Sequence, residues 1–290
     1  KKKKSRAGRV KSYMYKYVLG AKRRKANKAS AAPSADDDDD ELPIVFSILG
    51  TSISSKSDTP HVLNPPLMDA LRPHLPFVVQ QDNFWLKYSM QRGDGANLLS
   101  LHHCIRHSAR TLLAIETTDG DVLGVFCSSP WRHSTQYFGS GEAFVWKLKG
   151  NRKKTPGKTL EERVALESDV QVHHWTGDNR NVQRLALPIS SSGTKFSDAV
   201  LMVGGGGPDT NASVDNAGGP AITLQSHLTT GFCDACPYTF GNKEPLLVDG
   251  MFQVANLEVW TLSPVHNLEQ AEQLELGRQF IFDHGNFVQQ

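Results

Sequence analysis

Short runs of apolar or alternating apolar and polar residues recur along the chain after residue 110. In residues 143–148, Phe144, Trp146 and Leu148 share one face and the residues between them share the other. This period of two is typical of a half-buried β-strand. Further short strands are predicted at residues 111–116, 122–127, 170–175, 182–187, 199–203, 221–224 and 257–262. Asp119-Gly120 separates the first two runs and predicts a tight hairpin.

Helical spacing occurs in three segments. They cover residues 67–71, 96–109 and 265–280. In the second, Leu98, Leu101 and Ile105 recur at spacings of three and four. The third follows Ser263-Pro264, which predicts a cap and a proline at the first helical position. Three leucines of this last helix are expected to dock it on the body: Leu268, Leu274 and Leu276.

Many short strands without a helix between each pair favour antiparallel sheets over βαβ units. Two such sheets stacked face to face would bury the alternating faces. The predicted fold is therefore mainly β (α+β), a two-sheet antiparallel β-sandwich with short flanking helices and a C-terminal helix.

Charge divides the chain into three parts. Residues 1–35 hold 13 Lys and Arg and no acid, and residues 36–41 are six consecutive acids. The remaining residues, 42–290, carry 19 basic and 24 acidic groups, a net of −5, although the whole chain has a net charge of +2. We predict a disordered basic arm with an acidic spacer at 1–41, a domain at 42–262 and a helical extension at 263–290. Because the first residue is Lys1, we expect a fragment or processed form with upstream domains missing.

Composition also limits the class of protein. The sequence has no apolar run of about 18 residues, so no membrane-spanning helix is predicted. Four cysteines do not make a disulfide scaffold, and few cysteines favour the cytoplasmic side, in the cytosol or at an organelle surface. The basic arm is also typical of mitochondrial or nuclear signals and of contact with acidic surfaces or nucleic acid.

Three motifs invite ligand chemistry. The run Gly204–Gly207 lacks the helix start and Lys of a phosphate loop, which favours a tight strand exit. Cys233 and Cys236 have CxxC spacing, but no second CxxC supplies the other ligands of a zinc site. His103 and His107 share a helix face, but Cys104 stands where a zinc protease needs Glu. We therefore predict no metal and no cofactor.

Two carboxylates sit at informative positions. Glu142 lies in a glycine-rich turn, and Glu258 lies inside an apolar strand next to Trp260. A carboxylate among apolar residues either faces solvent, is hydrogen-bonded or has a raised pKa. No Gly-x-Ser-x-Gly elbow occurs. The sequence thus favours a non-enzymatic module, with a hydrolase-like enzyme using Glu142 and Glu258 as the alternative.

Five motifs follow one another in register over residues 63–262. They are Pro130 and Trp131 after the hairpin, Gly139, Gly141 and Glu142 in an aromatic-Gly-x-Gly-Glu-x-Phe pattern, Trp175, Gly177 and Asn179 in a Trp-Thr-Gly-x-Asn pattern, the glycines Gly204, Gly205 and Gly206, and finally Thr239, Phe240, Glu258 and Trp260. Together these motifs resemble the TLDc domain family, named after its co-occurrence with TBC and LysM modules.

The resemblance implies a two-sheet β-sandwich, protection against oxidative stress and binding to peripheral subunits of the vacuolar proton-pumping ATPase (V-ATPase). No settled reaction comes with it. One segment departs from the family pattern, because Gln225, Ser226 and His227 stand where acids are expected. A role for that acidic patch is not carried over to this chain.

Protection against oxidative stress could involve reactive cysteine thiols. Cys104 and Cys127 lie among apolar residues and are expected to be buried, whereas Cys233 and Cys236 lie in a polar loop. A thiol scavenges oxidant only when it is exposed and has a lowered pKa. Cys233 and Cys236 are therefore the redox candidates.

Overall fold

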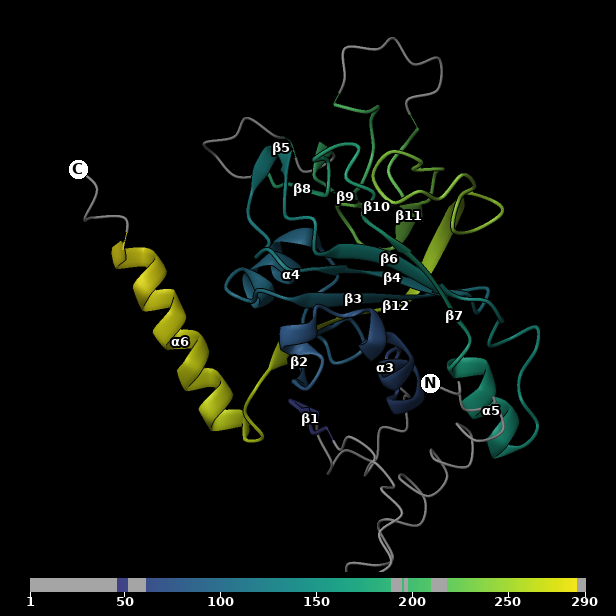
Figure 1. Cartoon of the computed structure of the whole chain (residues 1–290), viewed down its shortest axis with the longest axis horizontal. Coiled ribbons are helices and arrows are strands. Elements are labelled where there is room, and N and C mark those ends of the chain that lie inside the picture. Colours follow the sequence, from purple (N-terminus) through teal and green to yellow (C-terminus); the bar gives the residue numbers. More distant parts are fainter. Residues whose placement is uncertain (1–45, 52–60, 189–194, 196–197, 210–217, 286–290) are drawn as a thin grey trace, which may run out of the picture.

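The computed structural model of the chain describes residues 46–51, 61–188, 195, 198–209 and 218–285. The predicted arm and spacer at 1–41 lie outside these residues. Two antiparallel sheets pack face to face, and helices cover the outer side of one of them (Figure 1). The predicted mainly β sandwich with flanking helices is confirmed.

The larger sheet forms the middle layer of the molecule. Its strands, in spatial order, are β1 (Ile48–Leu49), β2 (Asn83–Ser89), β12 (Met251–Ser263), β3 (Thr111–Thr117), β4 (Val122–Cys127), β6 (Ala143–Leu148) and β7 (Val170–His174). All neighbours are antiparallel except β1 and β2, which are parallel. Strands β3 and β4 form the predicted hairpin around Asp119-Gly120, where Gly120 has a φ of 90°.

The second sheet lies above the first in Figure 1. Its strands are β5 (Ser134–Phe138), β8 (Gln183–Ala186), β9 (Val200–Val203), β10 (Ile222–Gln225) and β11 (Thr230–Phe232). The long strand β12 joins the two sheets, because its start pairs with β11 and its later residues pair with β3 and β2. The register shifts between Val254 and Asn256, at the point where β12 passes from one sheet to the other.

Both faces of the larger sheet are buried. On β3, Leu113 and Ile115 point into the core between the sheets, and Leu112 and Ala114 point to a second core beneath the sheet. Strand β6 alternates in the same way, as predicted. It is however buried on both faces rather than on one, because the helical layer covers the face that bears Phe144. The prediction of a half-buried strand was wrong for this reason.

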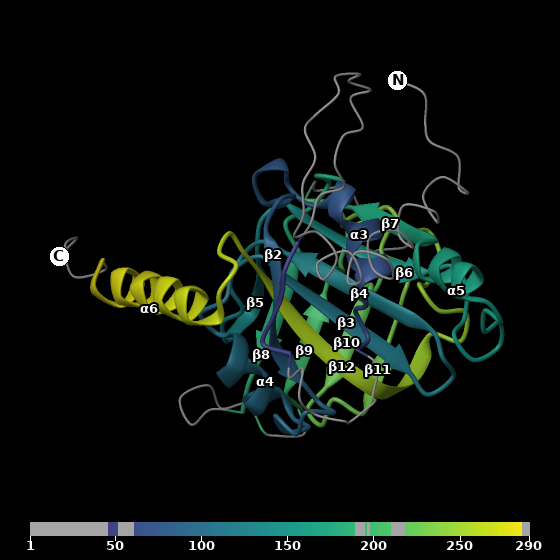
Figure 2. The ribbon, with the colours of Figure 1, turned by 90° about the horizontal axis from the view of Figure 1, so that it is seen from below.

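Short helical elements around α3 (Pro65–Leu71) form that covering layer, seen from below in Figure 2, whereas α4 (Leu98–Ile105) packs against the core between the two sheets. The other described helical elements before the C-terminal helix are the 3-10 turns η2 (Arg72–His74) and η3 (Phe77–Val79) and the helix α5 (Leu160–Glu167). Asn64 caps α3 by accepting the Leu67 N–H at 3.1 Å, and Asn97 caps α4 in the same way. The Asn97 cap sets the start of α4 at Leu98, and the helix ends at Ile105, so α4 is shorter at both ends than the predicted 96–109.

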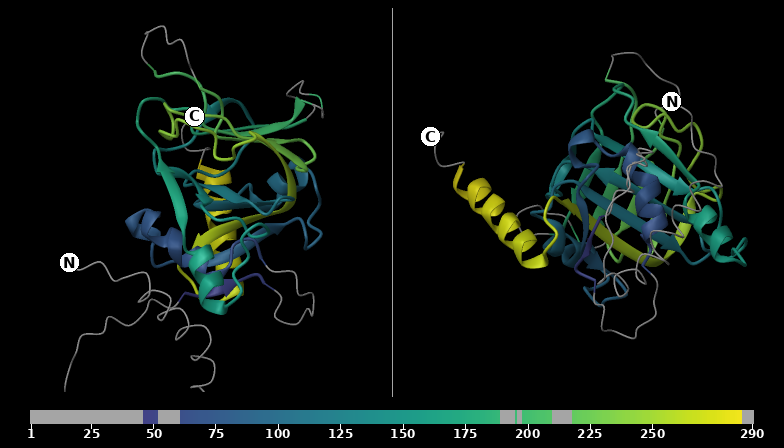
Figure 3. Two further views of the ribbon diagram at one scale, coloured as in Figure 1. Left: turned by 90° about the vertical axis from the view of Figure 1, so that its right-hand side faces the viewer. Right: turned by 60° about the horizontal axis from the view of Figure 1, so that its bottom comes forward.

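The C-terminal helix α6 (Leu268–Gly285) extends to one side of the sandwich (Figure 3). It begins later than predicted, because Ser263 is still paired with Asn83 in the sheet, and Asn267 accepts the Glu269 N–H instead. The expected docking leucines, Leu268, Leu274 and Leu276, are 38%, 37% and 63% exposed. Docking instead relies on Ala271, which is buried against Trp85 and Leu49. Among the described helices, none has the length and apolar content needed to cross a bilayer.

Candidate functional site

The carboxylate of Glu258 is enclosed in the middle of strand β12. The residue is 1% exposed, and its oxygens accept hydrogen bonds from three groups. The donors are the Leu63 N–H at 3.2 Å, Trp260 Nε1 at 3.0 Å and the His61 ring, whose Nδ1 lies 2.9 Å away. A buried charge is tolerated only when it is paired and hydrogen-bonded, and Glu258 meets both conditions.

His61 closes this cluster at the surface. Its side chain is 40% exposed, and its ring meets the Trp260 ring edge-on with centroids 5.4 Å apart. The hydrogen bond to Glu258 raises the pKa of His61 above the ordinary value of 6.5, against the lowering effect of burial. The pair therefore favours the charged imidazolium beside the buried carboxylate.

Arg152 holds the same segment from the other side. Its guanidinium donates to the Val62 carbonyl at 2.7 Å and to both oxygens of Glu167 at 2.8 Å each. Burial alone would lower the pKa of Arg152, but hydrogen bonds and ion pairs with Glu167 and Glu116 outweigh it, so the pKa of Arg152 is raised. Residues 61–63 are thus clamped between strand β12 and the loop before α5.

Glu142 does not join this cluster. It is exposed in the turn before β6 and donates its N–H to the Ser140 hydroxyl at 3.3 Å. Glu258 is in register, through β3 and β4, with Trp146. That row spans about 14 Å, and Glu142 lies about 13 Å farther along β6. Catalytic carboxylate pairs are only about 5–10 Å apart, so the geometry does not support the proposed pair.

The other motifs meet at one end of the sandwich. Asn179 is fully buried and donates through Nδ2 to the carbonyls of Gly205 at 3.2 Å and Gly207 at 3.0 Å. Its Oδ1 accepts the Thr239 hydroxyl at 3.0 Å, and Thr239 Oγ1 in turn accepts the Gly205 N–H at 3.2 Å. Three loops that are distant in sequence are therefore tied together by one amide and one hydroxyl.

Close packing explains two of the motif glycines. A Cβ at Gly141 would lie 2.3 Å from the Trp175 ring, and a Cβ at Gly204 would lie 2.6 Å from Cys236 Sγ. Gly204 also has a φ of 75°, which non-glycine residues rarely adopt. Positive φ values occur as well at Gly139, Gly177, Gly205 and Gly206. The glycine run is a strand exit, as predicted.

Each tryptophan of the motifs fastens a loop or strand through its ring nitrogen. Trp131, which follows the exposed Pro130, donates to the Thr111 hydroxyl at 3.0 Å. Trp175 donates to the Asn179 carbonyl at 2.8 Å, and Trp260 donates to Glu258. Phe240 is buried in the core between the sheets. The motif residues thus serve mainly to hold loops in place.

The thiols differ from expectation. Cys233 and Cys236 are each 1% exposed, because their loop folds over the end of the core. Burial raises the pKa of Cys233 to about 12. Cys127 is buried as predicted, but Cys104, expected to be buried, is partly exposed and has a raised pKa. All four thiols are free. Burial of Cys233 and Cys236 therefore removes the exposure that a redox role of these two candidates would need.

The remaining polar candidates do not converge. His103 is exposed on α4, and the described residues contain no group of three or more His, Cys, Asp or Glu that could hold a metal ion. In the segment where the family pattern has acids, Gln225 and His227 are exposed, whereas Ser226 is buried and accepts the Leu98 N–H at 3.0 Å through its carbonyl. That turn therefore fixes the start of α4.

Known proteins of similar sequence cover about half to three quarters of the chain. Oxidation resistance protein 1 of Candida glabrata is 30% identical over 139 residues, which cover 45% of this chain and 48% of that protein. Its namesake in Podospora anserina is 25% identical over 233 residues, covering 74% and 63%. The GTPase-activating protein skywalker of Drosophila melanogaster is 28% identical over 175 residues, covering 57% and 24%. The chain thus spans about half to two thirds of the first two relatives. The family model of the TLDc domain matches residues 56–263, and the chain belongs to this family.

Proposed function

We propose that this chain is a non-enzymatic TLDc interaction module that protects against oxidative damage by binding peripheral subunits of the V-ATPase. Relatives named oxidation resistance protein 1 support the first half of this proposal. Binding to peripheral V-ATPase subunits, the second half of the proposal, rests on the resemblance of the five motifs to the TLDc family. The compartment we expect is the cytoplasmic side, where the peripheral subunits of such a pump are accessible.

One observation carries the non-enzymatic part of the proposal. The polar motif residues that an enzyme would use for chemistry are already committed to the fold: Glu258 accepts three hydrogen bonds, and Asn179 and Thr239 bind each other and the glycine loop. A catalytic group needs a reacting atom within hydrogen-bond reach in a cleft. Glu258 instead has its accessible side closed by His61 and Trp260.

The same rigid construction suits a binding surface. Loops held by buried hydrogen bonds lose little conformational entropy when a partner binds, so binding is stronger for a given contact area. The loops fixed by Asn179 and Thr239 lie at one end of the sandwich, and those fixed by Glu258 and Arg152 lie under the larger sheet. Both sets are therefore preorganised to contact a protein partner.

Affinity purification of the full chain from cells tests the proposal. We expect enrichment of peripheral V-ATPase subunits over a bait of similar size with an unrelated β-sandwich fold. The matched bait is Asn179→Ala, which should loosen the loops at one end. Equal recovery of the pump subunits with the unrelated sandwich would contradict the partner assignment.

Survival of cells in peroxide tests the protective role separately from the pump interaction. Cells that carry the chain should survive peroxide better than cells that lack it, and Glu142→Gln should not change this protection, because Glu142 is exposed and takes no part in the Glu258 cluster. If Glu142→Gln abolished protection while leaving the fold and the pump interaction intact, the enzymatic alternative would gain support.

A further inference from the structure

A basic segment interrupts the acidic body of the protein. Residues 149–163 contain six of the 19 Lys and Arg of residues 42–290 and only two acids. Lys154, Lys158 and Arg163 are exposed, and no salt bridge among the described residues involves them. Glu162, one of the two acids, is occupied by the helix cap, because its side chain accepts the N–H groups of Lys158 and Thr159. Lys149 pairs with Asp169, and Arg152 pairs with Glu116 and Glu167. Among the described residues, the basic side chains of this segment without a salt bridge are therefore Lys153, Lys154, Lys158 and Arg163.

This charge borders an apolar groove between α5, the preceding loop and the start of α3. The groove has a volume of about 370 Å³. Its apolar lining is Pro66, Pro156, Leu160, Val164 and Leu166. Its charged lining is Arg163 together with Arg152 and Glu167, which pair with each other. An apolar floor with a cationic rim fits a peptide in which acids adjoin apolar residues.

The chain itself contains such a peptide directly before Phe46, the first described residue. Residues 36–41 are the six acids, and Leu42, Pro43, Ile44 and Val45 follow directly. Phe46, the next residue, lies against Arg72 at the end of α3, with the guanidinium 4.9 Å from its ring centroid. Pro66, at the start of α3, lines the groove.

Chain length permits the connection. A helix of seven residues, such as α3, is about 10 Å long. Four extended residues reach about 13 Å, so residues 42–45 are long enough to bring Glu41 from Phe46 to the groove. Residues 52–60, between the described residues 51 and 61, contain one Lys and one Asp and lack the charge that the rim would attract.

We propose that residues 36–45 fold back along α3 to this groove, with the six acids against Lys154, Lys158 and Arg163 and Leu42, next to Glu41, against the apolar floor. The contact is an intramolecular clasp, independent of the pump interaction proposed above. It places the acidic block on the sandwich rather than on the basic arm, and leaves the 13 positive charges of residues 1–35 available to other partners.

Carbodiimide cross-linking of the full chain tests the contact directly, because this reagent joins a carboxylate to an amine only when the two touch. Peptide mapping should find residues 36–41 joined to Lys154 or Lys158. The cross-links should be strong at low salt and fade at about 1 M salt, where the screening length falls to about 3 Å. Cross-links confined to the lysines of residues 1–35 would overturn the proposal.

A competition experiment provides the second test. A labelled peptide of residues 34–46 is titrated into the full chain and into a variant whose six acids are replaced by Asn or Gln. We expect at least tenfold tighter binding to the neutralised chain, because a tethered segment competes at an effective concentration in the millimolar range. Equal affinities would overturn the proposal.

Charge-matched variants locate the binding. In the neutralised chain, Lys154→Gln/Lys158→Gln/Arg163→Gln should abolish peptide binding. The control triple, Arg180→Gln/Lys195→Gln/Lys243→Gln, removes three other exposed charges and should leave binding unchanged. Binding that survives the groove triple would show capture by the arm and would also overturn the proposal.

Discussion

Glu258 and His61, 197 residues apart in the sequence, lie with Oε1 and Nδ1 2.9 Å apart. The carboxylate is fully enclosed, whereas the ring is part-exposed. Through this pair and the Leu63 N–H, strand β12 holds the segment that enters α3. Glu258, a motif residue that the sequence allows as a catalytic group, therefore serves to hold residues 61–63 against strand β12.

Glu258→Gln should destabilise the protein by about 3 kcal/mol. The amide keeps the shape, but it removes the charge beside His61 and presents one donor group to groups that also donate. Urea unfolding measures the effect, with Glu142→Gln as the control expected to change stability by less than about 0.5 kcal/mol. A stable Glu258→Gln protein with lost peroxide protection would argue for a chemical role instead.

The contribution of His61 should depend on pH. Because the pKa of His61 is raised in the folded state, its stabilisation is complete below the ordinary value of 6.5 and is lost as the pH rises through the folded-state pKa. The free energy of unfolding of His61→Gln should therefore fall below that of the parent mainly at low pH. Measurements at about pH 5.5 and about pH 8.5 test this, with the exposed His103→Gln as control. A difference that grows with pH would contradict the pairing.

Asn179→Ala should cost about 2–3 kcal/mol, because it leaves the carbonyls of Gly205 and Gly207 and the Thr239 hydroxyl short of their buried partner. Thermal unfolding provides the measurement. Asp178→Ala, an exposed neighbour in the same turn, is the matched control. Equal melting temperatures for the two variants would show that the loops are not held by the amide.

Labelling with iodoacetamide should follow the burial of the thiols. Cys104 should react first in the native protein, and Cys233, Cys236 and Cys127 should react only on unfolding. Mass spectrometry of labelled peptides over time tests the order. Rapid native labelling of Cys233 would be inconsistent with its raised pKa and would restore it as a redox candidate.

Local pattern was sufficient for the central strands. The alternation at 143–148 and the Asp119-Gly120 turn place β6 and the β3–β4 hairpin within a residue of the observed bounds. No strand was predicted at β2, although the prediction of 257–262 covers part of its paired partner β12. Helix α5 was missed too, although Thr159 and Glu162 form a capping box that the sequence displays.

The site was less predictable, because its partners are distant in sequence. Inspection of Glu258 alone left solvent exposure, hydrogen bonding and a raised pKa as alternatives, and only the fold supplies His61 and Leu63 as donors. Likewise, polar neighbours suggested that Cys233 is exposed, but the loop closes over the core. Local sequence does not report such long-range burial.

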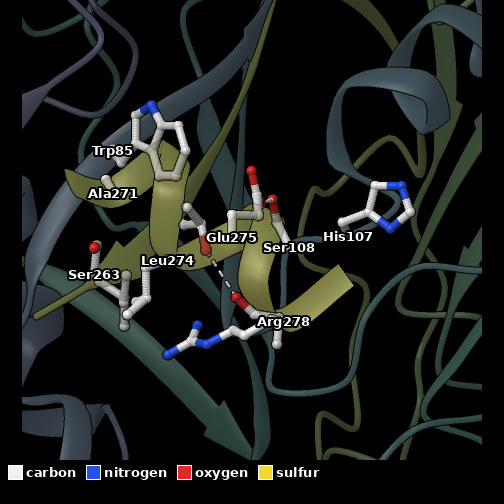
Figure 4. A pocket seen from close by; sticks show the side chains of 11 residues that line it. Trp85, His107, Ser108, Ser263, Ala271, Leu274, Glu275 and Arg278 are labelled. Atoms are coloured by element: carbon white, nitrogen blue, oxygen red, sulfur yellow. Dashed lines mark hydrogen bonds between the residues drawn. The ribbon is translucent and has the colours of Figure 1, made fainter. Parts of the chain in front are cut away.

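Helix α6 should be the most easily released element. A small cavity of about 10 Å³ lies between α6 and the sheet. Figure 4 shows Ala271, Leu274, Glu275 and Arg278 among the side chains that line it. Glu275 accepts a hydrogen bond from the Ser108 hydroxyl at 2.5 Å and pairs with Lys87. Most other described side chains of α6 are exposed, so few other contacts would hold the helix on the body if those of Glu275 were lost.

Glu275→Gln should therefore raise the amide hydrogen exchange of α6 by about tenfold, which corresponds to about 1.4 kcal/mol of local stability, while β3 and β4 stay protected. Glu272→Gln, exposed on the same helix, is the control. If both variants exchanged alike, Ala271 alone would hold the helix, since it is the buried side chain at this contact. Faster exchange throughout the sandwich would instead mean that α6 is part of the cooperative fold, because local opening leaves the central strands protected.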